Sequence, residues 1–307
     1  MAKPTHIFVV GLSRTGTNMM RKILNTSDEI ALCGETHYLK HWMGYEGFQR
    51  EFASVADISS DAGLDKLVDY IYNLRDNQKR ARSFWRWVQN RIDPDTFRQR
   101  LQESSRDSWA PLEVVMDYFA EGKPIQGDKT PAHLYAVPEL LERYPRAKIV
   151  HMFRDLRAIF VSEKRWQMSR EFVTFPYGIL RRSELLLEIF LSFHALLTWL
   201  RAVQLHYQYQ QRFPENYYLC RFENVVSDPA VELKRISEFL GIDFTDAMLE
   251  ISYQNSTVRA QQQSQGLDAS AASRWQQHMN PITNRWLLFW SKKHLIRFGY
   301  QVDNQPS

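Results

Sequence analysis

Cysteine is scarce in this sequence, and nothing around it resembles a metal-binding pattern. Two cysteines, Cys33 and Cys220, occur among 307 residues, with no CxxC motif and no paired Cys/His spacing. A disulfide framework is therefore not expected, and neither is a zinc site. Because unpaired cysteines are typical of reducing compartments, we expect a cytoplasmic protein.

Dense charge runs and a membrane segment are also missing. The formal net charge is +4, and no Lys/Arg stretch is dense enough to predict nucleic-acid binding. The first apolar run, near the N-terminus, is too short for a signal peptide or a membrane span. The longest, Leu185 to Leu200, is interrupted by Glu188, Ser192 and His194 and continues into polar residues. It therefore predicts a long buried helix and not a membrane span.

The sequence does contain enough apolar residues for a large core. Hydrophobic residues make up 44% and charged residues 24% of the chain, which is typical of a globular protein. The length suits one large α/β domain or two small ones. Because we find no internal repeat and no Pro/Gly-rich linker, we predict a single domain over residues 1–307.

The stretch His6–Asn18, HIFVVGLSRTGTN, is the centre of our interpretation. His6–Val10 is short, apolar and rich in β-branched residues, which predicts a buried strand. Gly11 and Gly16 bracket the turn that follows, and Met19–Leu24 carries an apolar stripe at helical spacing. A strand, a glycine-bracketed turn and a helix aim several backbone N–H groups at one anion, with the positive helix end behind them.

The same stretch differs from a nucleotide-binding P-loop. Gly11 and Gly16 have the spacing of G-x-x-x-x-G-K-[ST], but Thr17 stands where the lysine belongs and Asn18 where the magnesium-binding hydroxyl belongs. A kinase needs both groups to offset phosphoryl charge. The turn therefore favours an anion handled without magnesium, with Arg14 as an added cation. A plain strand-to-helix turn is the alternative.

Two polar residues follow the second apolar run. Glu29–Cys33 ends at Gly34, and Glu35 and His37 come next. Side chains at the carboxyl ends of parallel strands lie where open α/β sheets bind ligands. Glu35 is a candidate general base, and His37 a candidate substrate contact or assisting group. The alternative is that both are solvated loop residues.

A third strand, Lys148–Phe153, ends at Arg154, which places this cation at the same sheet edge if the strands are parallel. Ser162 lies two helical turns further on, so the pair is suited to a second phosphate; surface ion pairing is the alternative for Arg154.

In Gly127–Pro131, Pro131 is expected to open a helix capped by Thr130. Lys129 would then lie near that helix start, although a solvated lysine is the alternative.

The remaining segments are mostly helical in pattern. Residues 41–126 predict a helical insertion whose tryptophans, Trp85, Trp87 and Trp109, are more typical of core than of a sugar platform. Residues 217–222 predict a fourth strand, and Asp228-Pro229 begins a helix that closes at Gly241. Residues 254–273 predict a mobile loop, and residues 286–298 a helix docked on the sheet.

Four segments in collinear order resemble the sulfotransferases that use 3′-phosphoadenosine 5′-phosphosulfate (PAPS), especially bacterial and Golgi-type members. GLSRTGTN resembles the family's 5′-phosphosulfate loop, usually written G-x-P-R-S/T-G-T-T/S. GDKTP followed by YPRAKIVHMFRDLRAIFVSE resembles its central block, and CRFENVVSDPAVELKRISEFLGI its R-Y-E-D-L…D-P…FLG segment. SRWQQHMNP is similar to its C-terminal R-W element, so the match runs from about residue 6 to 285.

This resemblance implies a fold and a set of roles. The fold is α/β, a P-loop-like parallel β-sheet flanked by helices, with the helical insertion on the acceptor side. Glu35 is implied as the catalytic base, with Lys129 and Arg14 near the sulfuryl group. Glu223 is still interpreted as structural. The residues implied to bind the nucleotide are Arg14, Thr15, Gly16, Thr17 and Asn18 at the 5′-phosphosulfate, Arg154 and Ser162 at the 3′-phosphate, and Arg274 over the nucleotide.

Several positions depart from the family pattern. Asn18 replaces a Thr or Ser, so an amide would do the work of a hydroxyl. Ser13 and Leu156 each replace a proline, which loosens the turn and the helix start. Phe222 and Asn224 soften the R-Y-E-D pattern. None of these changes removes a cation that the chemistry needs.

The hypothesis is metal-independent transfer of a sulfuryl group from PAPS to a hydroxyl or amine, with release of PAP. The acceptor is a small molecule, a glycan or a lipid; the sequence indicates neither its identity nor the oligomeric state. A P-loop small-molecule kinase is one alternative, disfavoured by the absent lysine. A non-catalytic nucleotide- or glycan-binding module, which would not need Glu35, is the other.

Overall fold

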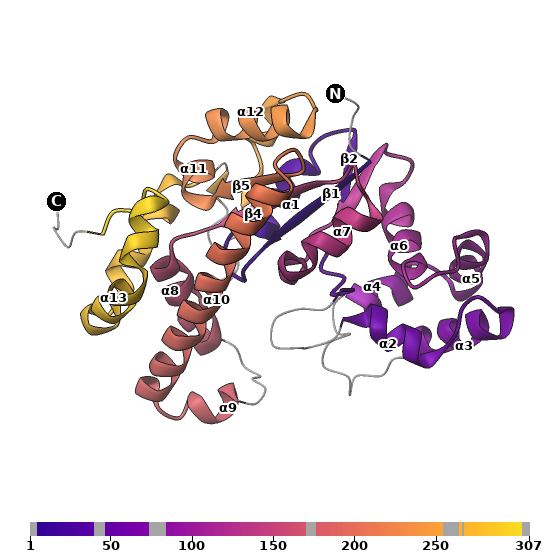
Figure 1. Cartoon of the computed structure of the whole chain (residues 1–307), viewed down its shortest axis with the longest axis horizontal. Coiled ribbons are helices and arrows are strands. Elements are labelled where there is room, and N and C mark those ends of the chain that lie inside the picture. The colour runs from indigo at the N-terminus through magenta and orange to yellow at the C-terminus, as the bar shows by residue number, and fades with distance from the viewer. Residues whose placement is uncertain are drawn as a thin grey trace. The chain divides into compact units, whose positions relative to one another are not determined.

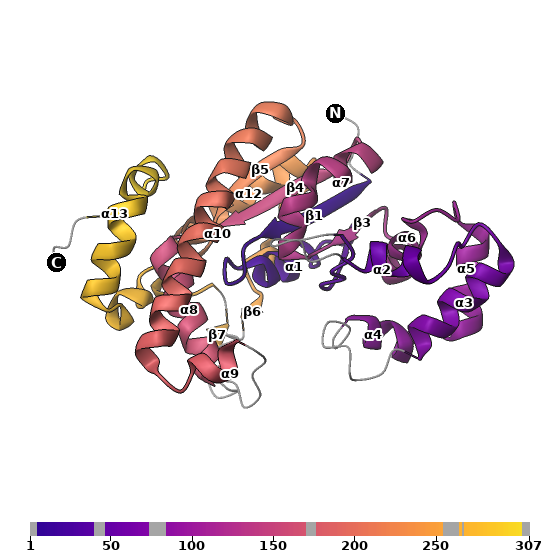
Figure 2. The same cartoon turned by 60° about the horizontal axis from the view of Figure 1, so that its bottom comes forward.

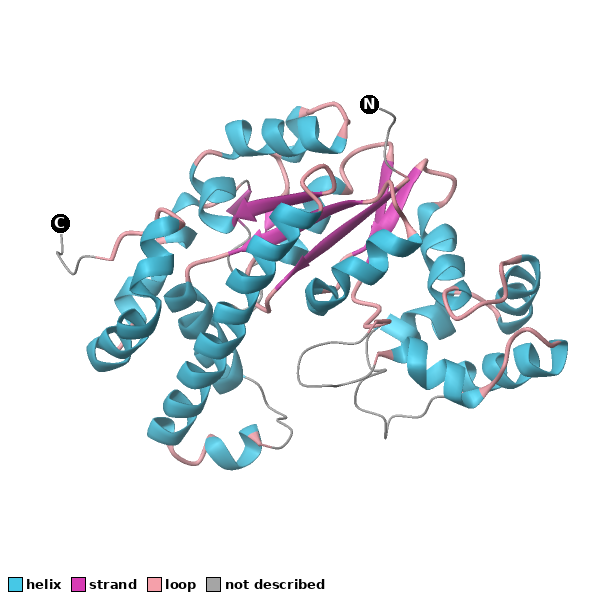
Figure 3. Cartoon of the chain, in the orientation of Figure 1, coloured by secondary structure: helices cyan, strands magenta, loops and turns pink. Residues whose placement is uncertain are grey.

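The protein has an α/β fold, as predicted. The computed structural model describes residues 5–39, 47–73, 84–169, 176–253, 264–265 and 267–302. Its centre is a parallel sheet in the order β2-β3-β1-β4-β5, with helices against it (Figures 1 and 3). The strands are β1 His6–Gly11, β2 Ile30–Cys33, β3 Ile125–Asp128, β4 Lys148–Phe153 and β5 Tyr217–Arg221.

Strand β3 was not predicted. Its sequence, IQGD, has one large apolar residue and therefore lacks the apolar run that marked the other four strands. Register explains why it forms: Ile7 of β1 and Leu32 of β2 both pair with Gly127, so β3 is bonded on both sides. Backbone pairing with two apolar neighbours makes this strand, and its own side chains do not signal it.

The chain divides into two compact units. The first comprises residues 1–10 and 24–150, and the second residues 11–23 and 151–307. The division falls within the predicted single domain, which stays a prediction.

The first unit holds the helical segment expected for residues 41–126. The described parts are helical as predicted, while residues 40–46 and 74–83 lie outside the described residues. Its core is aromatic: Trp85 is buried, with its ring centroid 4.8 Å from that of Phe52 and 5.6 Å from that of Phe48. The helices are α2 Phe48–Val55, α3 Asp61–Tyr72, α4 Phe84–Arg91, α5 Pro94–Glu103, α6 Ala110–Ala120 and α7 Val137–Arg143.

The second unit is built around its longest helix. This helix, α10, runs over Glu184–Arg212 and packs against α8, α13 and β5. Among the described residues it alone is long and apolar enough to cross a membrane by length and composition, and 56% of the relevant window is buried in the protein. The other helices are α1 Thr17–Leu24, α8 Leu156–Ser169, α9 Tyr177–Leu180, α11 Phe222–Ser227, α12 Pro229–Leu240 and α13 Pro281–Arg297.

The structure modifies two expectations about the C-terminal part. The tail helix α13 packs mainly on α10 and α8, and the expected contact with the sheet is made by Phe298, just after the helix, whose ring centroid lies 4.6 Å from that of Phe153 of β4. In the expected loop 254–273, residues 254–263 and 266 lie outside the described residues. The described part of this segment includes a 3-10 helix, Ala269–Ala272, which packs on α11. This part of the expected loop is therefore helical and in contact with the rest of the unit.

Candidate functional site

The loop Gly11–Thr17 of the second unit makes a tight turn ahead of α1. Arg14 and Gly16 have positive φ angles of 70° and 91°, and the Thr15 hydroxyl donates a hydrogen bond to the Leu12 carbonyl oxygen at 2.7 Å. The Met20 N–H then donates to the Gly16 carbonyl oxygen at 3.1 Å and begins the helix. Successive N–H groups in such a turn, at a helix start, suit an anion.

Two predicted binding segments, distant in sequence, meet at Arg14. Its Nε donates a hydrogen bond to the Ser162 hydroxyl oxygen at 3.0 Å, although the two residues lie 148 positions apart. The Arg154 guanidinium donates to the Arg14 carbonyl oxygen, also at 3.0 Å. Arg14, Arg154 and Ser162 therefore form one connected cluster, which sequence pattern alone placed in two separate segments.

Arg154 is held by contacts from three directions. Its guanidinium carbon lies 4.0 Å from the ring centroid of Phe222, and a second nitrogen donates to the Ala271 carbonyl oxygen at 3.1 Å. The Trp199 indole N–H donates to the Arg154 carbonyl oxygen at 3.0 Å. Phe222, which departs from the family pattern, thus supplies the stacking face for this arginine.

Below the cluster, a buried network fixes the start of α8. The Asp155 carboxylate accepts hydrogen bonds from the Arg157 backbone N–H at 2.8 Å and from its guanidinium at 2.7 Å. The Glu223 carboxylate accepts the Asp155 N–H at 3.0 Å and the Tyr300 hydroxyl at 3.1 Å. Burial raises the pKa of Glu223. These contacts agree with the structural role expected for Glu223.

Three further residues predicted to bind the nucleotide do not belong to the cluster of Arg14, Arg154 and Ser162. Thr17, the first residue of α1, is buried, and Asn18 is exposed. Arg274 is about one-third exposed and bonds within its own segment, donating to the Ser270 hydroxyl oxygen at 2.7 Å and pairing with Asp268. The described residues therefore show Arg274 occupied locally, in a 3-10 helix that packs against α8.

Gly16→Ala is expected to destabilise this loop. A Cβ at Gly16 would lie 2.6 Å from a ring carbon of Phe222, on a backbone with φ of 91°. Strain at a positive φ costs about 1–2 kcal/mol, and displacing the Phe222 ring also disturbs the support of Arg154. Thermal unfolding and PAP affinity, measured by calorimetry, should both fall.

Gly122→Ala is the matched control for that change. Gly122 has φ of 86°, and a Cβ there would meet nothing within 4 Å. It carries the same backbone strain without the collision, so its melting temperature should fall less and its PAP affinity should not change. Equal PAP affinity in the two variants would show that the Gly16 turn does not shape the binding loop.

In the first unit, the predicted base Glu35 is ion-paired. Lys129, which is buried, donates to one carboxylate oxygen of Glu35, and His37 Nε2 lies 3.4 Å from the other. Burial opposes ionisation of Glu35, but the hydrogen bond from His37 and the charge of Lys129 outweigh it and lower its pKa to about 2. Glu35 is thus a carboxylate at neutral pH, and Lys129 is not the solvated residue of the alternative interpretation.

A buried aspartate orients the segment that carries Glu35. The Asp128 carboxylate accepts the Thr36 N–H at 3.2 Å and the Thr130 hydroxyl at 3.0 Å. The Thr130 hydroxyl oxygen also accepts the His37 N–H at 3.4 Å. Pro131 opens a helix as expected, a 3-10 helix over Pro131–Ala136 with Thr130 at its N-cap position. The Thr130 hydroxyl, however, binds Asp128 and does not cap the helix.

His133 completes this network, which sequence reasoning missed. His133 Nδ1 lies 3.0 Å from Asp128, and the Leu39 N–H donates to Nε2 at 3.2 Å, so Nδ1 carries the proton. Both side chains are fully buried. Burial opposes ionisation of Asp128, but its contacts with His133, Thr36 and Thr130 lower its pKa overall. Both residues lie within or just after GDKTP, and that position was the available signal.

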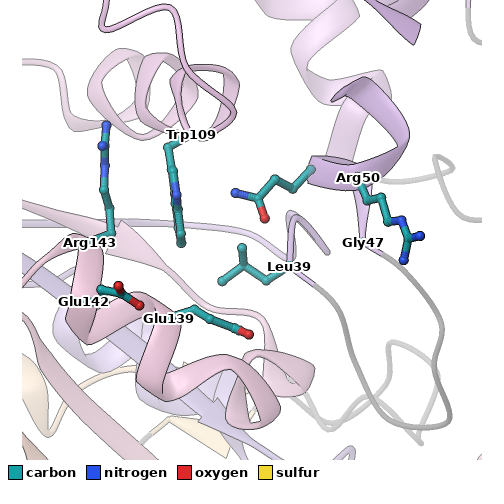
Figure 4. Close-up of a pocket in the computed structure, with 8 residues that line it drawn as sticks. Leu39, Gly47, Arg50, Trp109, Glu139, Glu142 and Arg143 are labelled. Carbon is teal, nitrogen blue, oxygen red and sulfur yellow. The ribbon is translucent and has the colours of Figure 1, made fainter. Parts of the chain in front are cut away.

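A pocket in the first unit adjoins the same segment. It has a volume of about 600 Å³, begins at Leu39, and combines an indole face with charges of both signs (Figure 4). Trp109, expected in the core, is half-buried at its wall, whereas Trp85 is in the core as predicted. The lining residues are Leu39, Gly47, Gln49, Arg50, Trp109, Glu139, Glu142 and Arg143.

The known sequences that this chain resembles are sulfotransferases. The model of the sulfotransferase family matches residues 4–246. Protein-tyrosine sulfotransferase A of Caenorhabditis elegans is 23% identical over 245 residues, which is 79% of this chain and 51% of that protein. The chain therefore spans about half the length of the curated relative that it matches.

Solved structures agree in fold. The sulfotransferase domain from the Synechococcus PCC 7002 olefin synthase superposes with a TM-score of 0.58 at 17% identity, over 99% of this chain and 98% of that domain. The sulfotransferase domain from the curacin biosynthetic pathway gives 0.56 at 16% identity, over 98% and 99%. At these sequence identities the similarity shows a shared fold.

Proposed function

Because this chain belongs to the sulfotransferase family, we propose that it transfers a sulfuryl group from PAPS to an acceptor hydroxyl or amine, releasing PAP. The observation that carries the proposal is the link between the glycine loop and Arg154, the arginine that follows β4. Arg14 bonds Ser162, and Arg154 bonds Arg14, so two cations and a hydroxyl converge within one unit. Such a cluster suits a ligand with two separate anionic ends.

The donor's two ends are assigned to different parts of this cluster. The N–H groups of the loop around Thr15 and Gly16, at the start of α1, bind the 5′-phosphosulfate, assisted by Thr17 and Asn18. Arg154 and Ser162 bind the 3′-phosphate. Arg274 closes over the nucleotide, for which it must leave Asp268 and Ser270.

The reaction is an in-line displacement at sulfur. The acceptor oxygen or nitrogen forms a bond to sulfur while the bond from sulfur to the bridging oxygen of PAP breaks. Glu35 takes the acceptor's proton, and Arg14 and Lys129 stabilise the negative charge that develops on the leaving oxygen. Preorganised donors of this kind each lower the barrier by about 3 kcal/mol.

The acceptor is assigned to the first unit. The pocket at Leu39 combines the Trp109 indole with the carboxylates of Glu139 and Glu142, which suits a polar, hydroxylated small molecule, a glycan or a lipid headgroup. His37, next to Glu35, contacts the acceptor. We place the reaction in the cytoplasm and without a metal, as expected from the sequence.

Two measurements test the proposal. Calorimetry should show PAP binding, and incubation with PAPS and a panel of hydroxyl and amine acceptors should add the mass of one sulfo group. ATP with magnesium is the comparison donor. Absence of PAP binding by the folded protein, or transfer of phosphate from ATP instead, would overturn it; PAP binding without transfer to any acceptor would favour a binding module.

A further inference from the structure

Helix α13 exposes a row of large apolar side chains. Ile282 and Phe289 are each 78% exposed, and Trp290 is 57% exposed. At about 100° per residue, Ile282, Phe289 and Ile296 fall on one line along the helix, with Trp286 and Trp290 beside it. The opposite side, which includes Leu287 and Leu295, is buried. Exposed aromatic and aliphatic side chains in such numbers mark an interaction surface.

The same side of α13 is strongly cationic. Arg285, Lys292, Lys293 and Arg297 are all exposed, and the helix contains no acidic residue. By the same helical spacing, Arg285 and Lys292 lie on one side of the apolar line, and Lys293 and Arg297 on the other. The apolar row is therefore bordered by cations along both edges.

Helix α10 extends this surface. Leu185, Ile189, Phe193 and Leu197, spaced four residues apart, are each 45–68% exposed. Phe193 contacts α13 directly, with its ring centroid 4.5 Å from that of Trp286, and the two helices pack together (Figures 1 and 2). We call these exposed residues of both helices the α10–α13 face.

Two acidic residues of α10 near this face are bound by one lysine of α8. Glu188 of α10 is buried and bonded to Lys164 at 2.6 Å and to Thr283. Glu184 pairs with the same lysine at 2.9 Å. Both carboxylates are therefore directed at Lys164 of α8 and not at the exposed cations of α13.

We propose that the α10–α13 face binds the surface of an anionic lipid bilayer. Tryptophan and phenylalanine insert at the headgroup level, and flanking lysines and arginines attract anionic headgroups. A second copy of the chain fits less well, because a two-fold contact would set the cations of one α13 against those of the other. The inner side of α10 packs on β5 and α8, so the protein lies on the bilayer and does not span it.

Vesicle sedimentation of the full chain tests this inference. Vesicles of phosphatidylcholine with about 30% phosphatidylglycerol should pellet the protein, and pure phosphatidylcholine vesicles should not. Binding should weaken as salt rises, because screening reduces the attraction. Tryptophan fluorescence should shift to shorter wavelength on binding as Trp286 and Trp290 leave water.

Paired substitutions separate the apolar contribution to vesicle binding from the cationic contribution. Phe289→Ser with Trp290→Ser should abolish the fluorescence shift and most binding. Lys292→Glu with Lys293→Glu should weaken binding at least about tenfold, since each cation near an anionic surface contributes several-fold. The control is on α12, where Lys234→Glu with Arg235→Glu should leave vesicle binding unchanged apart from a small general charge effect.

All of these variants change exposed residues, so each is expected to fold, and thermal melting checks this. Equal binding of the α13 and α12 variants, or no binding to anionic vesicles, overturns the inference. So does a dimer that Phe289→Ser and Trp290→Ser convert to monomer, because the face would then join two copies. None of these readouts depends on sulfuryl transfer.

Discussion

Glu35→Gln is expected to lower the turnover number for sulfuryl transfer by about 10²–10⁴-fold, the usual contribution of a positioned general base. The amide keeps the size of the side chain and its hydrogen bond to Lys129, but it cannot take the acceptor's proton. The loop and Arg154, which belong to the second unit, are untouched, so PAP affinity should stay unchanged. Steady-state kinetics with PAPS and calorimetry with PAP measure the two quantities.

Glu103→Gln is the matched control for this prediction. Glu103 is an exposed residue at the end of α5 that bonds Gln99 of the same helix at 2.9 Å. The same chemical change there should alter neither turnover nor binding. Wild-type turnover in Glu35→Gln would remove Glu35 as the base, without bearing on donor binding.

Arg154→Met should weaken PAP binding by about 10–100-fold, because hydrogen bonds to a charged group are worth about 1.5–3 kcal/mol. Methionine keeps much of the length and apolar stem but cannot bond a phosphate. It also releases the Arg14 and Ala271 carbonyl oxygens, so part of the loss reflects a looser loop. Calorimetry with PAP, and with adenosine 5′-phosphate lacking the 3′-phosphate, separates the two causes.

The comparison with adenosine 5′-phosphate shows which of the two causes applies. If Arg154 binds the 3′-phosphate, the variant should lose affinity for PAP and change little for adenosine 5′-phosphate. Arg235→Met is the control, since Arg235 is exposed and forms a long ion pair with Glu232 at 3.9 Å. An equal loss for both nucleotides would assign Arg154 to supporting the loop.

Part of the candidate site was predictable because it follows strand ends. Arg14 and Arg154 each come directly after an apolar run, and the carboxyl ends of parallel strands share one sheet edge. That rule anticipated their proximity, which the bond from Arg154 to the Arg14 carbonyl oxygen shows. It did not anticipate the bond from Arg14 to Ser162, which depends on the path of α8.

Other parts carried no local signal. Asp128 and His133 make a buried network with the segment at Glu35, but the partners are 92–94 positions apart in sequence, and β3, which bears Asp128, has no apolar pattern. A solvated lysine was the alternative interpretation of Lys129, because the burial of a lysine depends on the partner that the fold brings to it. Here that partner is Glu35, and neither position reveals the other by spacing.

The sequence by itself determined the order of the strands and helices that apolar periodicity marks, the glycine turn without the lysine of a nucleotide-binding P-loop, and the family. These properties are local, since each rests on a short run of residues. Tertiary structure alone decided which charges pair, that β3 exists, and that α10 and α13 leave an apolar, cationic face uncovered. Pairing and exposure depend on what the fold brings near each side chain, and a one-dimensional pattern does not contain those neighbours.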